Sequence, residues 1–127
     1  MIGFGNRPET LREVARRVKH GEQEFDFALG EFLDSFYLRS ERRLEAIAEA
    51  PERIEPLRDA YLAAVAEHLA RSYGMPVPAW TETQGNELNR PFFAGGLESL
   101  KAILLAESPT AFRRRLLFVS KNALSRA

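Results

Sequence analysis

Apolar positions recur at helical spacing in the first segment of the chain and predict a helix over residues 7–20. Asn6 can cap its amino terminus, and Pro8 suits the first turn, where no backbone N–H is required. Gly21 then ends the helix, because glycine readily takes the left-handed conformation that closes helices. The apolar positions in this helix are Leu11, Val14, Ala15 and Val18.

Aromatic residues repeat at helical spacing in the next segment and predict a second helix over residues 22–37. Its main apolar face consists of Phe25, Leu29, Phe32 and Phe36. Phe27 lies about 200° around the helix from Phe25 and therefore points elsewhere. A second apolar face is expected if the helix is sandwiched between neighbours or forms a dimer surface.

Two further helices follow. Residues 40–50 either continue the second helix or form a separate one, and Pro51 stops them. Residues 56–73 place an apolar residue at every fourth position with alanines between, and Gly74 closes this helix.

Proline and glycine are too frequent in residues 74–96 for regular structure. A loop of about 20 residues is uncommon in a small domain and is usually either functional or disordered. This one carries Trp80, Phe92 and Phe93. We therefore expect it to run over the surface of the protein, held in place by those rings.

Shorter elements are predicted after this loop. Residues 97–106 form a leucine-rich helix, and Ser108 caps the next helix, which starts at Pro109. Residues 116–119 either extend that helix or form a short extended piece.

The predicted fold class is all-α, a single helical bundle with a long Pro/Gly-rich irregular segment before the C-terminal helices. The expected organisation is a single helical domain, 1–127, with a helical core at 6–73, an irregular loop at 74–96 and C-terminal helices at 97–127.

Composition limits the class of protein. Hydrophobic residues make up 45% of the sequence, which is enough for a real core. Cysteine is absent, which excludes disulfides and thiolate metal sites. No apolar run reaches the roughly 20 residues that span a bilayer, and residues 1–5 do not resemble a signal peptide. We expect a cytoplasmic protein that does not associate with membranes.

Charge is balanced overall but differs between the halves. Residues 1–79 carry 11 basic and 14 acidic side chains, whereas residues 80–127 carry 7 basic and 4 acidic ones. This asymmetry could orient a partner or pair two copies head to tail, so a homo-oligomer is possible. It falls short of the basic surface expected of a dedicated nucleic-acid binder.

Residue patterns typical of catalysis are missing from the sequence. The two histidines, His20 and His68, are not part of an H-E-x-x-H zinc pattern, and there is no G-x-S-x-G nucleophile elbow. Pairs of carboxylates four residues apart also occur, but such pairs on helices most often lie on a solvent-exposed face without a catalytic role. We therefore predict no catalytic residue, no cofactor and no metal site, and we do not expect an enzyme.

Aromatic and arginine residues gather after residue 79 and are the candidates for partner binding, because such side chains often anchor interfaces. Successive helical residues advance by about 100°, so three adjacent arginines cannot all point one way. We expect one of them to pair with an internal carboxylate, for which Glu107 is a candidate, or to cap a helix. The predicted partner-binding residues are Trp80, Phe92, Phe93, Arg113, Arg114 and Arg115.

The order of motifs in the C-terminal half resembles a group of small bacterial antitoxin-like proteins encoded beside nucleotidyltransferase-type toxins. The motifs are Pro78-x-Trp80, Pro91-Phe92-Phe93, Ser108-Pro109-x-x-Phe112-Arg113-Arg114-Arg115 and Leu124-Ser125-Arg126-Ala127. The resemblance implies a non-enzymatic protein that binds and restrains a toxic nucleotidyltransferase. Many of these proteins also carry a helix-turn-helix domain, but the N-terminal helices here lack that signature.

The sequence therefore favours an antitoxin-like interaction module. Its aromatic loop and arginine cluster would engage a toxin-like partner protein and occlude the partner's nucleotide or RNA site. The alternative is a nucleic-acid-binding transcriptional regulator that uses Arg113 to Arg115 together with Lys121.

Overall fold

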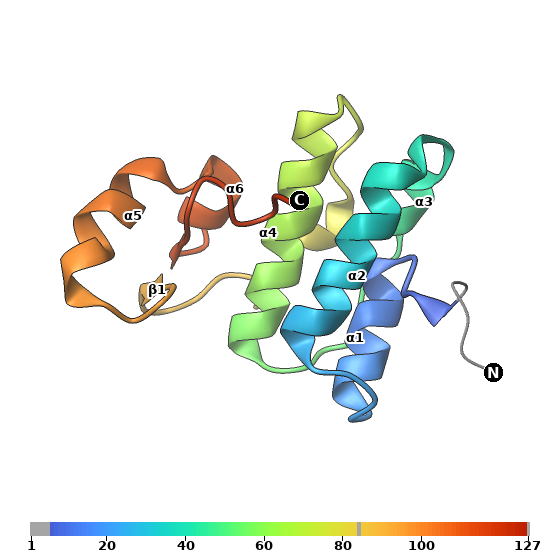
Figure 1. Cartoon of the computed structure of the whole chain (residues 1–127), viewed down its shortest axis with the longest axis horizontal. Helices are drawn as coiled ribbons and strands as arrows, with labels where there is room; N and C mark the ends of the chain where they lie inside the picture. The colour runs from blue at the N-terminus through green and yellow to red at the C-terminus, as the bar shows by residue number, and fades with distance from the viewer. Residues whose placement is uncertain (1–5, 84, 127) are drawn as a thin grey trace. The chain divides into compact units, whose positions relative to one another are not determined.

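The computed structural model describes residues 6–83 and 85–126 and is mostly helical, as predicted (Figure 1). The chain divides into two compact units, the first made of residues up to Ile54 with Arg126, the second of residues 55–125. That these units form one bundle in a single domain stays a prediction. None of the helices in the described ranges combines the length and the apolar character needed to cross a bilayer.

The first unit opens with α1 (Leu11–Lys19). The Thr10 hydroxyl caps this helix by accepting a 3.0 Å hydrogen bond from the backbone N–H of Glu13. The helix therefore starts later than predicted, and the assignment of the cap to Asn6 is wrong. Gly21, with φ of 74°, follows the helix end in the left-handed conformation expected of it.

The second helix, α2 (Phe25–Leu38), packs against α1, and its predicted apolar face is buried. The rings of Phe32 and Phe36 lie 5.9 Å apart, centroid to centroid. Phe27 is exposed on a different face of α2, as its position around the helix predicted.

A separate short helix follows, made of the 3-10 turn η2 (Ser40–Arg42) and α3 (Arg43–Ala48). The Arg43 guanidinium donates hydrogen bonds to the carbonyl oxygens of Phe36 (3.1 Å) and Tyr37 (3.0 Å). These contacts satisfy carbonyls in the last turn of α2 that the end of the helix leaves without an intrahelical partner.

The second unit is built on α4 (Pro56–Ser72), which begins where the sequence predicted and ends one residue earlier, with Tyr73 as its C-cap. The Glu55 carboxylate caps it by accepting a 3.0 Å hydrogen bond from the N–H of Arg58. The 3-10 turn η3 (Ala79–Glu82) and α6 (Thr110–Arg113) both pack against α4.

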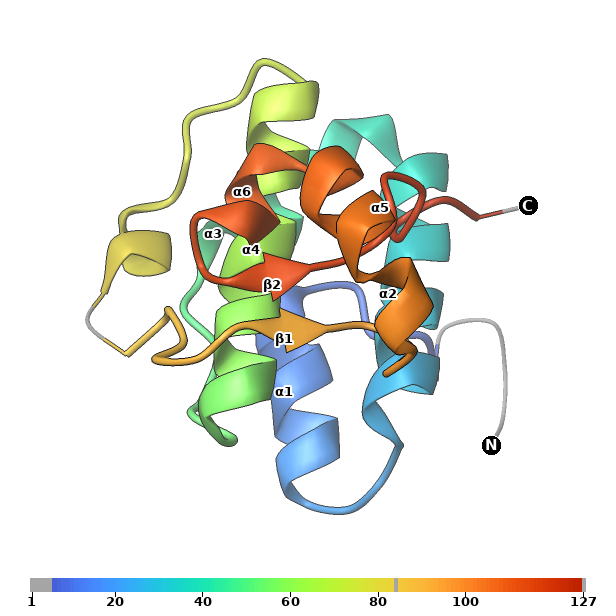
Figure 2. The same ribbon diagram turned by 90° about the vertical axis from the view of Figure 1, so that its left-hand side faces the viewer.

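A short parallel β-pair departs from the all-α prediction. Strand β1 (Phe92–Phe93) lies beside β2 (Leu117–Phe118), with both arrows pointing the same way (Figure 2). The N–H of Phe92 donates to the carbonyl of Leu116 (2.9 Å), and that of Ala94 to Phe118 (3.0 Å). The Pro/Gly-rich segment thus contains a strand. Of residues 116–119, Leu117 and Phe118 take the extended alternative, whereas Leu116 lies in a turn with φ of 64°.

The remaining elements are η4 (Glu98–Leu100) and α5 (Lys101–Glu107), which precede α6. Ser108 does not cap α6, contrary to the prediction. Its buried hydroxyl instead lies 2.5 Å from the carbonyl of Leu104 and accepts a 2.8 Å hydrogen bond from the N–H of Val119. Ser108 therefore joins α5 to the segment after β2.

Candidate functional site

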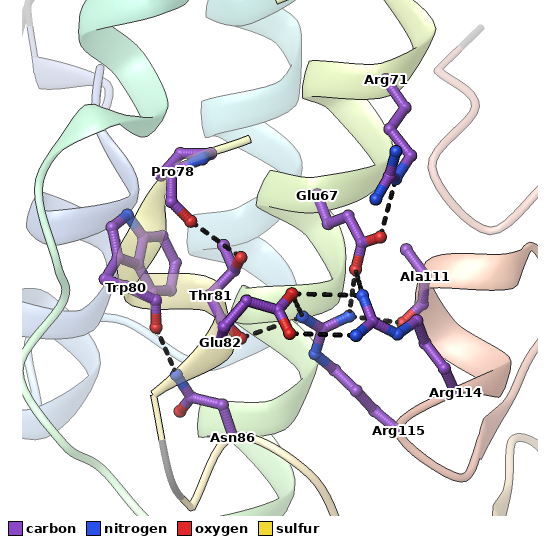
Figure 3. Close-up of polar contacts among 10 residues, drawn as sticks. All are labelled: Glu67, Arg71, Pro78, Trp80, Thr81, Glu82, Asn86, Ala111, Arg114 and Arg115. Carbon is purple, nitrogen blue, oxygen red and sulfur yellow. Dashed lines mark hydrogen bonds and ion pairs between the residues drawn. The ribbon is translucent and has the colours of Figure 1, made fainter. Parts of the chain in front are cut away.

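Arg115 lies at the centre of a buried ionic cluster (Figure 3). Its guanidinium donates hydrogen bonds to the Glu67 carboxylate (2.6 Å) and to the carbonyls of Ala111 (2.7 Å) and Thr81 (2.9 Å). Arg115 is only 3% exposed and Glu67 only 1%. The expectation that one arginine pairs with an internal carboxylate is confirmed, but that carboxylate is Glu67, whereas the sequence suggested Glu107.

Two more arginines converge on the same carboxylate. Arg114 donates to Glu67 Oε1 (2.8 Å) and also forms a bidentate ion pair with the Glu82 carboxylate (2.9 and 3.1 Å). Arg71 donates to Glu67 Oε2 at 2.7 Å from the outer, exposed side. We call these five residues the Glu67 cluster; they are Glu67, Arg71, Glu82, Arg114 and Arg115.

Electrostatics keep Glu67 ionised. Burial by itself raises the pKa of this carboxyl, but hydrogen bonds from Arg115 and Arg71, with the charge of Arg114, outweigh it and leave the pKa below its ordinary value. The pKa of Arg114 is raised, chiefly by its hydrogen bond to Glu82. Three guanidinium groups thus face two carboxylates.

The cluster holds the turn that carries Trp80. Arg115 binds the Thr81 carbonyl, and Glu82 binds Arg114, so η3 is tied to α4 and α6. Within the segment, the Asn86 amide donates a 2.8 Å hydrogen bond to the carbonyl of Trp80. The Trp80 side chain is half-buried in this fixed setting.

The two phenylalanines of β1 are also half-buried. The Phe93 ring stacks on Phe118 with centroids 4.9 Å apart, and the Lys101 ammonium lies 5.1 Å from the Phe93 centroid. Phe93 therefore has a packing role, whereas Phe92 follows Pro91 with its side chain partly open.

Arg113 differs from its two neighbours. It is exposed, and its guanidinium donates a 2.8 Å hydrogen bond to the carbonyl of Ser108 beyond the end of α5. The structure thus places Arg114 and Arg115 beside the Trp80 turn, and directs Arg113 to the carboxyl end of α5.

Sequence reasoning missed Glu67 and Glu82 as members of this site. A signal for Glu67 was present, because this carboxylate interrupts a run of alanine, valine and leucine that is otherwise buried along α4. A charge in such a run is rarely buried without a partner. No comparable signal marks Glu82, which lies in the irregular segment.

The histidines and acidic residues form no metal centre in the described ranges. His68 is half-buried with its ring edge-on to Phe112 at 6.2 Å, and burial lowers the pKa of its imidazole. His20 is exposed, with Nε2 at 3.9 Å from the Glu52 carboxylate.

Compared with models of known protein families, with curated proteins and with solved structures, the chain matches none.

Proposed function

We propose that this chain is a cytoplasmic, non-enzymatic interaction module of antitoxin type, which binds and neutralises a partner protein such as a nucleotidyltransferase-type toxin. The motif resemblance of the C-terminal half motivates the choice of partner. The proposed contact residues are the half-buried rings of Trp80 and Phe92 with the exposed parts of Arg113 and Arg114.

The observation that carries this proposal is the fixation of the Trp80 turn by the Glu67 cluster. A loop that is already ordered loses little conformational entropy on binding, so more of its contact energy appears as affinity. Tryptophan and arginine are also the side chains most often found at the energetic centre of interfaces. An ordered turn that carries Trp80 and is bound through Glu82 to Arg114 suits protein recognition.

The burial of Arg115 and the packing of Phe93 refine the proposed site. Arg115 is enclosed by Glu67, Ala111 and Thr81, so its role is to hold the turn in place. Phe93 supports β1 through its stacking on Phe118. Both residues act on the partner indirectly, by positioning Trp80 and Phe92.

The same contacts favour a protein partner over the alternative of a nucleic acid. Phosphate binding requires cations that are free to replace counterions. Two of the four cations named for that alternative, Arg114 and Arg115, are already bound to Glu67 and Glu82, which bring negative charge to the same place. The mechanism would be steric: when the partner binds the Trp80 turn, this chain would cover the partner's nucleotide or RNA site.

The test is co-purification of this chain with the protein encoded by the neighbouring gene. We expect Trp80→Ala with Phe92→Ala to abolish the complex, because each anchor contributes about 2 kcal/mol when centrally buried. Leu38→Ala is the matched control, because this exposed apolar side chain belongs to the first unit and is distant in sequence from Trp80 and Phe92. A complex that survives the double substitution contradicts the proposed site.

A second measurement separates the two classes of partner. Binding of RNA or DNA that falls steeply with salt and survives the loss of Trp80 would favour the nucleic-acid alternative. Binding of a protein that depends on Trp80 and changes little with salt supports the proposal.

A further inference from the structure

Helix α5, with the turn before it, exposes more apolar surface than a short surface helix normally does. Its sequence runs Ala-Ile-Leu-Leu-Ala between Lys101 and Glu107, so apolar side chains surround the helix. Only Leu104 among them is buried, while Ile103 is 53% and Leu105 49% exposed. A helix that is apolar all round is normally covered. Leu105 lies about 200° around the helix from Ile103 and points to another side. We call the exposed set on the Ile103 side the leucine surface; it comprises Leu97, Leu100 and Ile103.

Two cations lie at the carboxyl end of the leucine surface. The Arg113 guanidinium reaches the carbonyls of Ser108 (2.8 Å) and Ala106 (3.4 Å). The backbone N–H of Lys121 donates to the Glu107 carboxylate at 3.2 Å, which brings Lys121 to the same end. Within the described ranges, neither the Arg113 nor the Lys121 side chain forms an ion pair. Glu107 offsets part of their charge, which leaves an excess of one positive charge there.

Helix α2 carries a surface of opposite charge, with an exposed aromatic residue among carboxylates. Phe27 is 61% exposed, and helical spacing places Glu31 on the same face, four residues after it. Glu24 is the N-cap residue of the same helix, three residues before Phe27. Asp26 is the adjacent residue. Glu31 accepts a 2.9 Å hydrogen bond from the neutral Gln23 amide. Among the residues that the structure describes, none of these three carboxylates pairs with a basic side chain. We call Phe27 with Glu24, Asp26 and Glu31 the acidic surface.

We infer that the acidic surface of one copy of this chain binds the leucine surface of a second copy. In this contact Phe27 packs among the exposed leucines, while Glu24 and Glu31 approach Arg113 and Lys121. Both the apolar and the charged parts then find complementary partners. Pairing of two acidic surfaces would instead bring carboxylates together, and pairing of two leucine surfaces would leave Phe27 of both copies uncovered.

The contact joins two different surfaces, so it is heterologous and runs head to tail. Each copy retains one unused surface, and association continues unless the rotation closes a ring. The contact uses neither Trp80 nor Phe92 and shares only Arg113 with the proposed partner site. Substitutions at Phe27 and Ile103 therefore test it without altering a proposed partner-contact residue.

Sedimentation of the full-length protein tests this inference. We expect the average mass of the unmodified chain to rise with protein concentration and to fall with added salt, because the charged contacts are screened. Phe27→Lys alone or Ile103→Glu alone should weaken association by about tenfold or more, since each places a charge in the apolar centre. Leu44→Lys is the control and should associate normally, because Leu44 is 55% exposed and lies in α3, outside both surfaces.

A mixing experiment distinguishes a heterologous contact from any other. The Phe27→Lys chain keeps its leucine surface, and the Ile103→Glu chain keeps its acidic surface. An equimolar mixture should therefore recover association and stop at two chains. Circular dichroism of each variant checks that it remains folded. An unmodified chain that stays monomeric at all concentrations, or a mixture of folded variants that fails to associate, overturns the inference.

Discussion

Arg115 donates a 2.6 Å hydrogen bond to Glu67 across 48 residues of sequence, and both side chains are almost fully removed from solvent. The remaining Arg115 donors reach the carbonyls of Ala111 and Thr81, so the buried guanidinium is well satisfied. A buried charge pair stabilises a fold only when its geometry is good and its other polar atoms are bonded. The pair meets these conditions and joins α4, η3 and α6.

Removal of Arg115 should therefore be far more damaging than removal of an exposed arginine from the same carboxylate. We expect Arg115→Met to lower the free energy of unfolding by about 3–5 kcal/mol, because Glu67 loses its buried partner. Arg71 also binds Glu67, at 2.7 Å, but its side chain is 62% exposed. Arg71→Met should cost less than about 1 kcal/mol.

Urea denaturation followed by Trp80 fluorescence measures both variants, because Trp80 is the only tryptophan and lies in the second unit. The difference between Arg115→Met and Arg71→Met isolates the effect of burial. Equal losses in the two variants would show that the buried pair has no special role.

The helices could be predicted from the sequence because their information is local. The spacing of Phe25, Phe32 and Phe36 specifies one face of α2, and those side chains are buried. The start of α1 was predicted wrongly because two capping signals lie close together. Asn6 and Thr10 each precede a glutamate by three residues, and the structure uses Thr10.

The candidate site could be predicted only in part because its contacts are not local. The sequence indicated that the arginine run needs an internal carboxylate, but pairing with Glu67 depends on how α6 meets α4. The pairing of β1 with β2 was not predicted either, because it also joins residues distant in sequence. In addition, strands of two residues are too short to show an alternating apolar pattern. Arg115 was predicted to bind a partner, but in the structure it is buried and holds the Trp80 turn through the Thr81 carbonyl.

Ser108 should contribute to stability through the two segments that it joins. In Ser108→Ala the N–H of Val119 loses its 2.8 Å acceptor, and the substitution leaves a buried donor unsatisfied. We expect a loss of about 1–3 kcal/mol in the free energy of unfolding. Ser99→Ala is the matched control, because Ser99 is exposed in η4 and should change stability by less than about 0.5 kcal/mol. Urea denaturation of the two variants provides the comparison, and equal midpoints would contradict the assigned role.

Glu13 should make the first unit sensitive to acid. Hydrogen bonds from Arg16 and, after the opposing effect of burial, from Arg17 lower the pKa of its carboxyl from 4.5 to about 2. A carboxyl whose pKa is lower in the folded state stabilises the fold above its unfolded pKa, and this contribution disappears as pH falls through the folded pKa. We expect Glu13→Gln to cost about 0.5–1 kcal/mol at neutral pH, since the side chains are partly exposed.

The difference in unfolding free energy between the unmodified chain and Glu13→Gln should shrink as pH falls from 4.5 toward 2. Denaturation followed by circular dichroism at several pH values measures it. Glu24→Gln is the control, because Glu24 is exposed and pairs with no basic side chain in the described part of the chain. A difference that stays constant over this range would argue against ionisation of Glu13 as the cause.

Glu82 should control how firmly the Trp80 turn is held. Its carboxylate binds the Arg114 guanidinium at 2.9 and 3.1 Å near the surface, and Glu82→Gln removes the charge while keeping a similar shape. Loss of a partly exposed ion pair should open the turn about two- to fivefold more often. Acrylamide should then quench Trp80 fluorescence more strongly in Glu82→Gln than in the unmodified chain.

Glu87→Gln makes the same chemical change at an exposed position of the same segment and should leave quenching unchanged. Added salt should reduce the difference between Glu82→Gln and the unmodified chain, because it screens the Arg114–Glu82 pair. Identical quenching in all three proteins would mean that Trp80 is held without help from Glu82.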